Sequence, residues 1–353
     1  MCELLGMSFN LPIKPNISFR GFCQRGEHNP DGWGIAYYPD ESVQIFKEPK
    51  KTNQSFLSRF LKNYDLLISK IIISHVRLTS GTIITHKNTH PFHRELNGKD
   101  YVFAHNGTLH SYRSLKLEYY KPVGDTDSEY AFCHLLHSIK AEQIDGWDNK
   151  NFEWLTQKFQ EINSKGSFNC IFSDGKYLFC YHDKHGYRGL NFLQRKPPYS
   201  KIKLLDEDWE VNLSAEKDPE QRGFIVATKP LTDENWKNFE SGELIVFKDG
   251  EIIYSNKRNI SEKINERPFD LFTDTEILIL KILRRSPNRL SIREITIKSN
   301  YSIDEIKNAI NSLYHNRYVF QDTRDKVNIN HEEATFYTNP KRRRDIDITI
   351  NAF

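Results

Sequence analysis

The chain has 353 residues, of which 38% are hydrophobic and 27% are charged, and its 50 Lys and Arg nearly balance its 47 Asp and Glu. This composition excludes a chain that is disordered throughout, and the length favours two domains over one. No apolar run approaches the roughly 20 residues that a membrane-spanning helix needs, so we expect a cytoplasmic protein with no membrane partner.

The cysteines form an odd set of five without C-x-x-C spacing: Cys2, Cys23, Cys133, Cys170 and Cys180. This pattern argues against a disulfide framework and against a zinc knuckle. We therefore expect at least one free thiol, no metal and no cofactor.

Short β-type runs and a few helical patterns fill residues 1–256. Helical periodicity covers residues 54–63, 127–140 and 151–164. The pair Asp174-Gly175 predicts a two-residue hairpin turn between two strands. Strands are predicted at residues 2–8, 33–38, 43–47, 71–77, 101–105, 168–173, 177–182, 224–228 and 243–247. Because the strands cluster rather than alternate strictly with helices, we predict the α+β class with antiparallel sheets.

A second predicted domain occupies residues 269–340, after a polar linker at 257–268 and before a basic tail at 341–353. Thr273, Ser291 and Ser302 each precede a Glu by three residues, which is the capping-box pattern of a helix start. Strands are predicted at 318–321 and 326–329. Three helices followed by a hairpin predict a small winged-helix-like domain.

The outward positions of the third of these helices are not basic, since they include Asp304, Glu305 and Asn308. Nucleic-acid affinity depends largely on neutralising phosphates. We therefore favour a protein-contact or dimerisation module over a DNA-binding one and do not expect a nucleic-acid partner. The oligomeric state stays open.

Cys2 is a candidate nucleophile. Removal of Met1 would leave Cys2 at the amino terminus, with a thiol that attacks and an α-amine, of ordinary pKa about 7.7 to 8.0, that accepts its proton. By itself this signal is weak, because residue 2 of any chain can happen to be cysteine.

Further motifs follow Cys2 in a characteristic order. They are Asp31-Gly32-Trp33-Gly34, Ser74-His75-Val76-Arg77, Thr89-His90-Pro91-Phe92, Ala104-His105-Asn106-Gly107-Thr108-Leu109 and Gly124-Asp125-Thr126-Asp127-Ser128-Glu129. With Cys2, this series resembles the glutaminase domain of the class-II glutamine amidotransferases, a branch of the N-terminal-nucleophile hydrolases. The resemblance covers residues 1 to about 255 and implies a four-layer αββα fold for the domain at 1–256.

The resemblance also implies roles for single residues. Cys2 would attack the side-chain amide of L-glutamine and form a γ-glutamyl thioester, and Asn106 and Gly107 would form the oxyanion hole. Arg77 would hold the substrate α-carboxylate and Asp127 the α-ammonium. The role of His90 is less defined, because it would either shape the substrate pocket or pack beneath it. Asp31 and Trp33 are expected to be structural.

Each residue also has a plainer interpretation. Arg77 could be a surface strand residue, Asn106-Gly107 an ordinary turn and Asp127 a helix cap. The spacing of His86, His90 and His93 would suit a metal site on a helix. Pro91 would interrupt such a helix, so the non-metal interpretation is preferred.

Two features depart from the family pattern. Leu78-Thr79-Ser80-Gly81 follows Arg77 where larger synthases carry Trp-Ala-Thr-His. The chain after residue 256 is also too short for a fused synthase domain of the usual kind. Either a separate ammonia-accepting enzyme is the partner, or the protein hydrolyses a γ-glutamyl compound. The alternative belongs to another functional class: a catalytically silent glutamine-sensing regulator that acts through its winged-helix-like domain.

Overall fold

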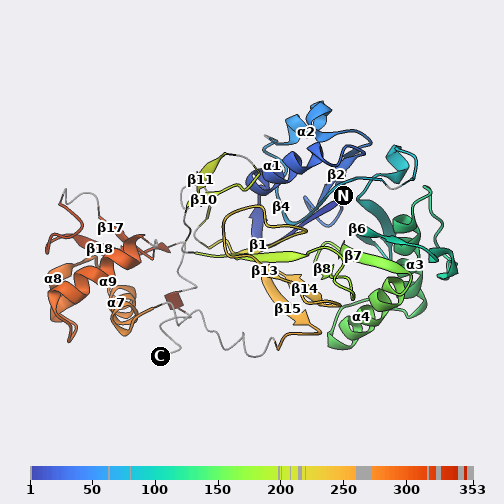
Figure 1. Cartoon of the computed structure of the whole chain (residues 1–353). Coiled ribbons are helices and arrows are strands. Elements are labelled where there is room, and N and C mark those ends of the chain that lie inside the picture. Colours follow the sequence, from blue (N-terminus) through green and yellow to red (C-terminus); the bar gives the residue numbers. More distant parts are fainter. Residues whose placement is uncertain are drawn as a thin grey trace. The chain divides into compact units, whose positions relative to one another are not determined.

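The computed structural model describes residues 2–62, 64–79, 81–197, 199, 201–206, 208–213, 217–218, 220–259, 272–315, 318–322, 327–340 and 346–347. The chain divides into two compact units (Figure 1). The first comprises Met1–Lys196, Lys201–Asn212 and Gln221–Ile260, and the second Pro197–Ser200, Leu213–Glu220 and Ser261–Phe353. Most of the predicted linker at 257–268 and of the predicted tail at 341–353 lies outside the described residues.

One sheet of the first unit contains strand β1, which begins directly after Cys2. Its strand order is β13-β9-β12-β1-β4-β2-β3, with antiparallel pairing throughout. The strands are β1 (Glu3–Ile13), β2 (Trp33–Tyr37), β3 (Gln44–Glu48), β4 (Ser69–Val76), β9 (Asn191–Arg195), β12 (Gly223–Ala227) and β13 (Lys237–Asn238). The hairpin β10 (Lys201–Lys203) and β11 (Glu210–Asn212) forms a separate small sheet.

The second sheet of this unit has the order β15-β14-β8-β7-β6-β5. Its strands are β5 (Phe92–Leu96), β6 (Lys99–Leu109), β7 (Gly166–Ser173), β8 (Leu178–Tyr181), β14 (Leu244–Lys248) and β15 (Glu251–Ser255). The predicted hairpin at Asp174-Gly175 is confirmed by the pairing of β7 with β8. Its loop has four residues rather than two, because Asp174 Oδ1 accepts hydrogen bonds from the amides of Lys176 and Tyr177 and so closes a wider turn.

Three hydrophobic clusters separate four layers. Leu4, Ile73 and Ala104 belong to the cluster between the two sheets. The outer face of the second sheet is covered by α3 (Asp127–Ala141) and α4 (Asn149–Asn163), and that of the first by α1 (Asn16–Gln24) and α2 (Phe56–Leu61). The first unit is thus a helix–sheet–sheet–helix sandwich (Figure 1). None of the described helices has the length and apolar character that a membrane crossing requires.

Among its described residues, the second unit packs helices α7, α8 and α9 on a sheet of order β16-β18-β17. Its elements are α7 (Asp274–Arg285), β16 (Leu290–Ser291), α8 (Ile292–Ile297), α9 (Ile303–His315), β17 (Val319–Gln321) and β18 (Thr335–Thr338). Capping boxes begin at Thr273, Ser291 and Ser302, as predicted. The prediction of a strand at 326–329 is wrong for residues 327–329, which the structure describes. Asn328 begins a turn there, and β17 pairs with β18 instead.

Candidate active site

Sheet register brings Cys2 and Arg77 together. Strands β1 and β4 are antiparallel, with Glu3 opposite Val76. Cys2 directly precedes Glu3 and Arg77 directly follows Val76, so these two residues meet at the same end of the sheet. The Cys2 thiol lies against the adjoining backbone, where Sγ accepts a hydrogen bond from the Leu78 amide at 3.3 Å and donates to the Leu78 carbonyl at 3.2 Å. Burial raises the pKa of the Cys2 thiol.

Strand alternation points several of these side chains into the space between the sheets. Leu4 and Ile73 face that space, so Cys2, two residues before Leu4, is on the same face. In the opposite sheet, Val102 and Ala104 face it, and the same alternation places Asn106 there. A cysteine and an amide from separate sheets therefore face the same interior.

Asn106 and Gly107 lie in the middle of a strand pair rather than in a turn, opposite Asn169 and Phe168 of β7. Asn106 is 3% exposed, and its Nδ2 has no hydrogen-bond partner among the described residues. A Cβ atom at Gly107 would lie 2.0 Å from the Ser167 carbonyl oxygen, so only glycine fits there. An unused buried donor is unusual in a folded protein.

Arg77 is 3% exposed, although it follows the end of β4. Its amide donates to the Gly32 carbonyl at 2.7 Å and its carbonyl accepts from the Asp31 amide at 3.0 Å. Its Nη2 donates to Thr82 Oγ1 at 2.5 Å. Asp31 Oδ2 in turn accepts from the amide of Thr79, at 2.8 Å. Thr82, which directly follows Leu78-Thr79-Ser80-Gly81, thus places its hydroxyl on the guanidinium.

Asp127 is the first residue of α3, directly after the N-cap Thr126. Its Oδ2 accepts a hydrogen bond from the Leu109 amide at 2.7 Å, and its Oδ1 accepts one from the Ser128 amide at 2.9 Å. These bonds fix the carboxylate at the end of β6, two residues beyond Gly107. Among the described residues, Oδ2 accepts the single bond from the Leu109 amide, so it keeps a further lone pair for a cationic ligand.

These residues surround a cavity of about 210 Å³. Cys2, Arg77, His90, Gly107 and Asp127 line it. Asn106 lies beside Gly107 but is not among the lining residues. This volume is below the roughly 300–1,000 Å³ of drug-sized sites, which favours a small ligand.

The sequence predicted no role for the other residues of the lining, although most of them lie within its motifs or in the loop that follows Arg77. They are Leu78, Thr79, Gly81, Thr82, His105, Thr108, Leu109, Tyr112, Asp125, Thr126 and Ser128. His105 directly precedes Asn106, and its Nε2 donates to the Ser167 carbonyl while its Nδ1 accepts from Ser128 Oγ. Thr82 follows the loop already noted for its unusual sequence. No sequence signal indicated Tyr112.

His90 stacks on His75 with ring centroids 4.2 Å apart, and its ring is tilted against that of Phe92 with centroids 4.5 Å apart. None of the four ring nitrogens of His75 and His90 has a hydrogen-bond partner in the described part of the chain. Burial lowers the pKa of His75 to about 3 and holds that of His90 well below its usual value, so both rings are neutral at pH 7. His90 forms part of the cavity wall, and its assignment to substrate binding stays a prediction.

The three histidines with metal-like spacing do not share a helix. His86 begins a 3₁₀ turn, whereas His93 lies in β5 and its Nε2 contacts Asp100 Oδ1 at 2.7 Å. Within the described ranges, no group of three His, Cys, Asp or Glu side chains is arranged to hold a metal ion.

Asn88 connects the two loops at the rim of the cavity. This residue is fully buried; its Oδ1 accepts from the Asp125 amide at 2.9 Å and its Nδ2 donates to the Ile83 carbonyl at 3.1 Å. One loop carries Thr82 beside Arg77 and the other leads into Asp127. A single amide side chain thus sets the spacing of the loops that hold the cation and the anion of the cavity.

An antiparallel helix–sheet–sheet–helix sandwich with a cysteine at the start of a central strand has the architecture of the N-terminal-nucleophile hydrolases. A model of the family described as class-II glutamine amidotransferases matches residues 1–269. The chain belongs to this family.

Individual relatives agree with this assignment. Uncharacterized protein MJ1515 of Methanocaldococcus jannaschii is 46% identical over 360 residues, covering 100% of this chain and 97% of that protein. YafJ of Escherichia coli, provisionally named a glutamine amidotransferase, is 37% identical over 71% of this chain and 99% of its own length. The crystal structure of a predicted glutamine amidotransferase from Pseudomonas aeruginosa is 33% identical, with a TM-score of 0.54 over 72% of this chain and 100% of that chain.

Proposed function

We propose that this protein cleaves the side-chain amide of L-glutamine, or of a γ-glutamyl amide, through a thioester on Cys2. The observation that carries the proposal is that a cysteine thiol, a buried guanidinium and a carboxylate line one small cavity. A cation and an anion together recognise an amino-acid head group, with Arg77 taking the α-carboxylate and Asp127 the α-ammonium. The γ-amide is then free to reach Cys2.

The reaction would proceed in two balanced steps. The α-amine of Cys2, freed by removal of Met1, takes the thiol proton, and sulfur attacks the amide carbon. The carbonyl oxygen becomes an anion that Asn106 Nδ2 and the Gly107 amide stabilise. The C–N bond then breaks, the nitrogen leaves as ammonia or an amine after accepting a proton, and water hydrolyses the thioester to glutamate and regenerates the thiol.

The test is glutamate release by the purified protein, with Met1 removal verified by mass, from L-glutamine and a panel of γ-glutamyl amides. Turnover of glutamine alone would indicate an ammonia donor for a separate acceptor enzyme. Preference for one γ-glutamyl amide would indicate a dedicated hydrolase. No glutamate from any compound would contradict cleavage by the protein alone and favour a partner-activated amidotransferase or the glutamine-sensing regulator.

Arg77→Lys tests the head-group assignment. A lysine keeps the positive charge but loses the two-pronged geometry that fits a carboxylate, so we expect KM to rise by about one to two orders of magnitude with kcat less affected. The kinetics of glutamate release measure both constants. An unchanged KM in the folded variant would contradict the role of Arg77.

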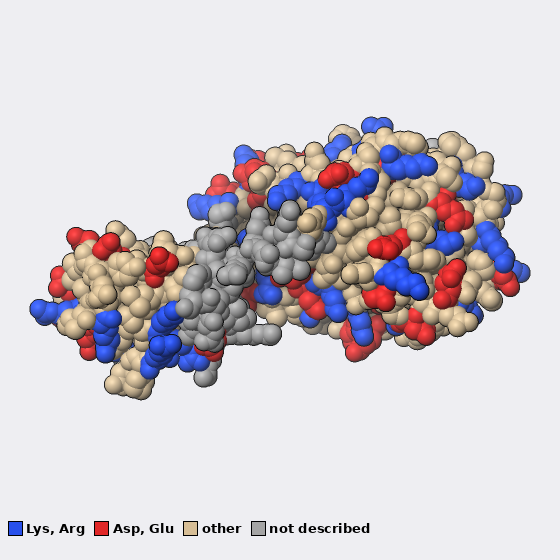
Figure 2. Space-filling view, turned by 90° about the horizontal axis from the view of Figure 1, so that it is seen from below, with Lys and Arg blue, Asp and Glu red and all other residues tan. Residues whose placement is uncertain are grey.

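We also propose that residues 269–340 form a winged-helix-like module that contacts protein rather than nucleic acid. Several of its basic side chains are paired with acids: Arg284 with Asp347, Arg289 with Asp322, Arg293 with Glu333 and Lys307 with Glu332. On the face in Figure 2, acidic and basic side chains are interspersed. Binding of duplex DNA that weakens with added salt would contradict this assignment.

A further inference from the structure

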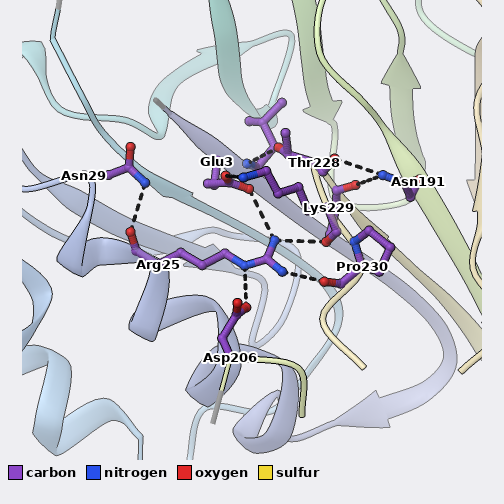
Figure 3. Close-up of polar contacts among 10 residues, drawn as sticks. Glu3, Arg25, Asn29, Asn191, Asp206, Thr228, Lys229 and Pro230 are labelled. Carbon is purple, nitrogen blue, oxygen red and sulfur yellow. Dashed lines mark hydrogen bonds and ion pairs between the residues drawn. The ribbon is translucent and has the colours of Figure 1, made fainter. Parts of the chain in front are cut away.

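Arg25 is a buried arginine outside the cavity, and its guanidinium is held from several sides (Figure 3). It is 8% exposed and lies in the 3₁₀ turn that follows α1. Its Nε donates to Asp206 Oδ2 at 2.8 Å, and its Nη1 donates to Glu3 Oε2 at 3.2 Å. The carbonyl oxygens of Lys229 and Pro230 accept from Nη1 and Nη2. This one side chain joins the start of β1, the β10–β11 hairpin and the segment after β12.

Glu3 is the contact that links Arg25 to the nucleophile. It directly follows Cys2, is 5% exposed, and lies opposite Val76 in the sheet register. Burial raises the pKa of the Glu3 carboxyl, while Arg25 and Lys229 oppose that rise by favouring the charged form. Glu3 is the first residue of β1, so its side-chain contacts act at the end of the strand that adjoins Cys2.

The same turn supports Arg77 by a separate route. Asn29 Nδ2 donates to the Arg25 carbonyl at 2.9 Å, and the Asp31-Gly32 segment that follows is hydrogen-bonded to the backbone of Arg77. This second route uses the Arg25 main chain. A change confined to the Arg25 side chain would therefore loosen Cys2 and leave the head-group site in place.

We propose that Arg25 is a positioning residue for Cys2, acting through Glu3. Its guanidinium holds the start of β1 against the segment at 228–230 and thereby keeps the Cys2 thiol beside the Leu78 backbone. The proposal rests on the proposed role of Cys2 as the nucleophile.

A purely structural role must be distinguished from positioning, because removing one partner of a buried ion pair destabilises a protein wherever it occurs. The chain offers a matched control in Arg195, at the end of β9 in the same sheet. Arg195 is 4% exposed and donates to Glu234 from both Nε and Nη2. Arg195 pairs with Gly223, which pairs with Phe9 of β1. Phe9 is seven residues from Cys2 along the chain, so at about 3.3 Å per residue Arg195 lies roughly 20 Å from Cys2 along the sheet.

The experiment compares Arg25→Lys with Arg195→Lys in the full chain. For each we would measure the thermal midpoint, kcat and KM for glutamate release, and the rate at which iodoacetamide alkylates Cys2, followed by peptide mass. The alkylation is readily assigned to Cys2, because Cys23, Cys133, Cys170 and Cys180 are all buried. The alkylation rate can also be measured without any substrate.

We expect Arg25→Lys to lower kcat by about tenfold to a hundredfold with KM within about twofold, since small displacements of a reacting group have effects of this size. Alkylation of Cys2 should become several-fold faster, because a loosened strand end exposes the thiol. Arg195→Lys should lower the thermal midpoint by a similar amount and leave kcat and alkylation unchanged. Activity that falls while the thiol becomes more accessible is the signature of lost positioning.

Two results would overturn the proposal: wild-type kcat and alkylation in Arg25→Lys, or the same changes in Arg195→Lys. If Arg25→Lys does not fold, Glu3→Gln tests the same link with nearly the same side-chain shape, and it should show the slower turnover and the faster alkylation. If the wild-type protein releases no glutamate from any compound, the proposed function fails, while the alkylation rates still decide the role of Arg25.

Discussion

Cys2→Ala is expected to reduce glutamate release to the uncatalysed background, a loss of at least about 10³-fold, because Cys2 supplies the only thiol among the described residues that line the cavity. The fold should be retained. Within the described part of the chain, the thiol hydrogen-bonds to the Leu78 backbone, and Cys2 belongs to none of the three hydrophobic clusters of the first unit, so its loss leaves them intact. The measurement is glutamate release together with the thermal midpoint.

The control for this variant is wild-type protein in which Met1 is retained. Its thiol is present but its α-amine is blocked, so it should also be inactive. Substantial glutamate release by Cys2→Ala would exclude Cys2 as the nucleophile. Activity in the Met1-retaining protein would instead exclude the α-amine as the base and leave the nucleophile assignment standing.

Asn106→Ala is expected to lower kcat by about 10²–10³-fold, the usual cost of losing one oxyanion-hole donor. The stability of the protein should change little. Asn106 Nδ2 has no hydrogen-bond partner among the described residues, so removing this donor breaks no bond seen in the structure. Steady-state kinetics and a thermal melt distinguish this combination from a general loss of structure.

Asn169→Ala is a suitable comparison, since Asn169 pairs with Asn106 across β6 and β7. The side chain of Asn169 is hydrogen-bonded on both sides of its amide: it donates to the Tyr187 carbonyl and accepts from the Asp183 amide. That variant should lose stability, whereas Asn106→Ala should lose turnover. A wild-type kcat in Asn106→Ala would rule out the oxyanion-hole role of this residue.

The prediction of secondary structure succeeded where local chemistry decides the outcome. The helix predicted at 127–140 is observed as Asp127–Ala141, because Thr126 caps it and accepts from the Glu129 amide. Helix α1, by contrast, was missed. It contains Gly21 and has no side-chain cap at its start, and a Cβ at Gly21 would lie 3.1 Å from Leu204 Cδ2 of a distant segment. Glycine has a low helix propensity, so local sequence does not favour a helix here. Gly21 is present because Leu204, from a distant segment, packs against it.

The sequence by itself determined the family, the positions of most strands and the order of the motifs from Cys2 to Asp127. These features are local, since strand alternation, caps and motif residues can be read along the chain. It also indicated which residue types would recognise an amino acid, because that follows from charge.

Only the tertiary structure decided which of these residues meet. Strand register places Cys2 beside Arg77, the facing of the sheets places Asn106 in the same interior, and the contacts of Asn88 set the spacing of the rim loops. The link from Arg25 to Glu3 is of the same kind, since the two residues are 22 positions apart and belong to different layers. Contacts between distant segments depend on how complete sheets and helices pack, and no local pattern encodes that packing.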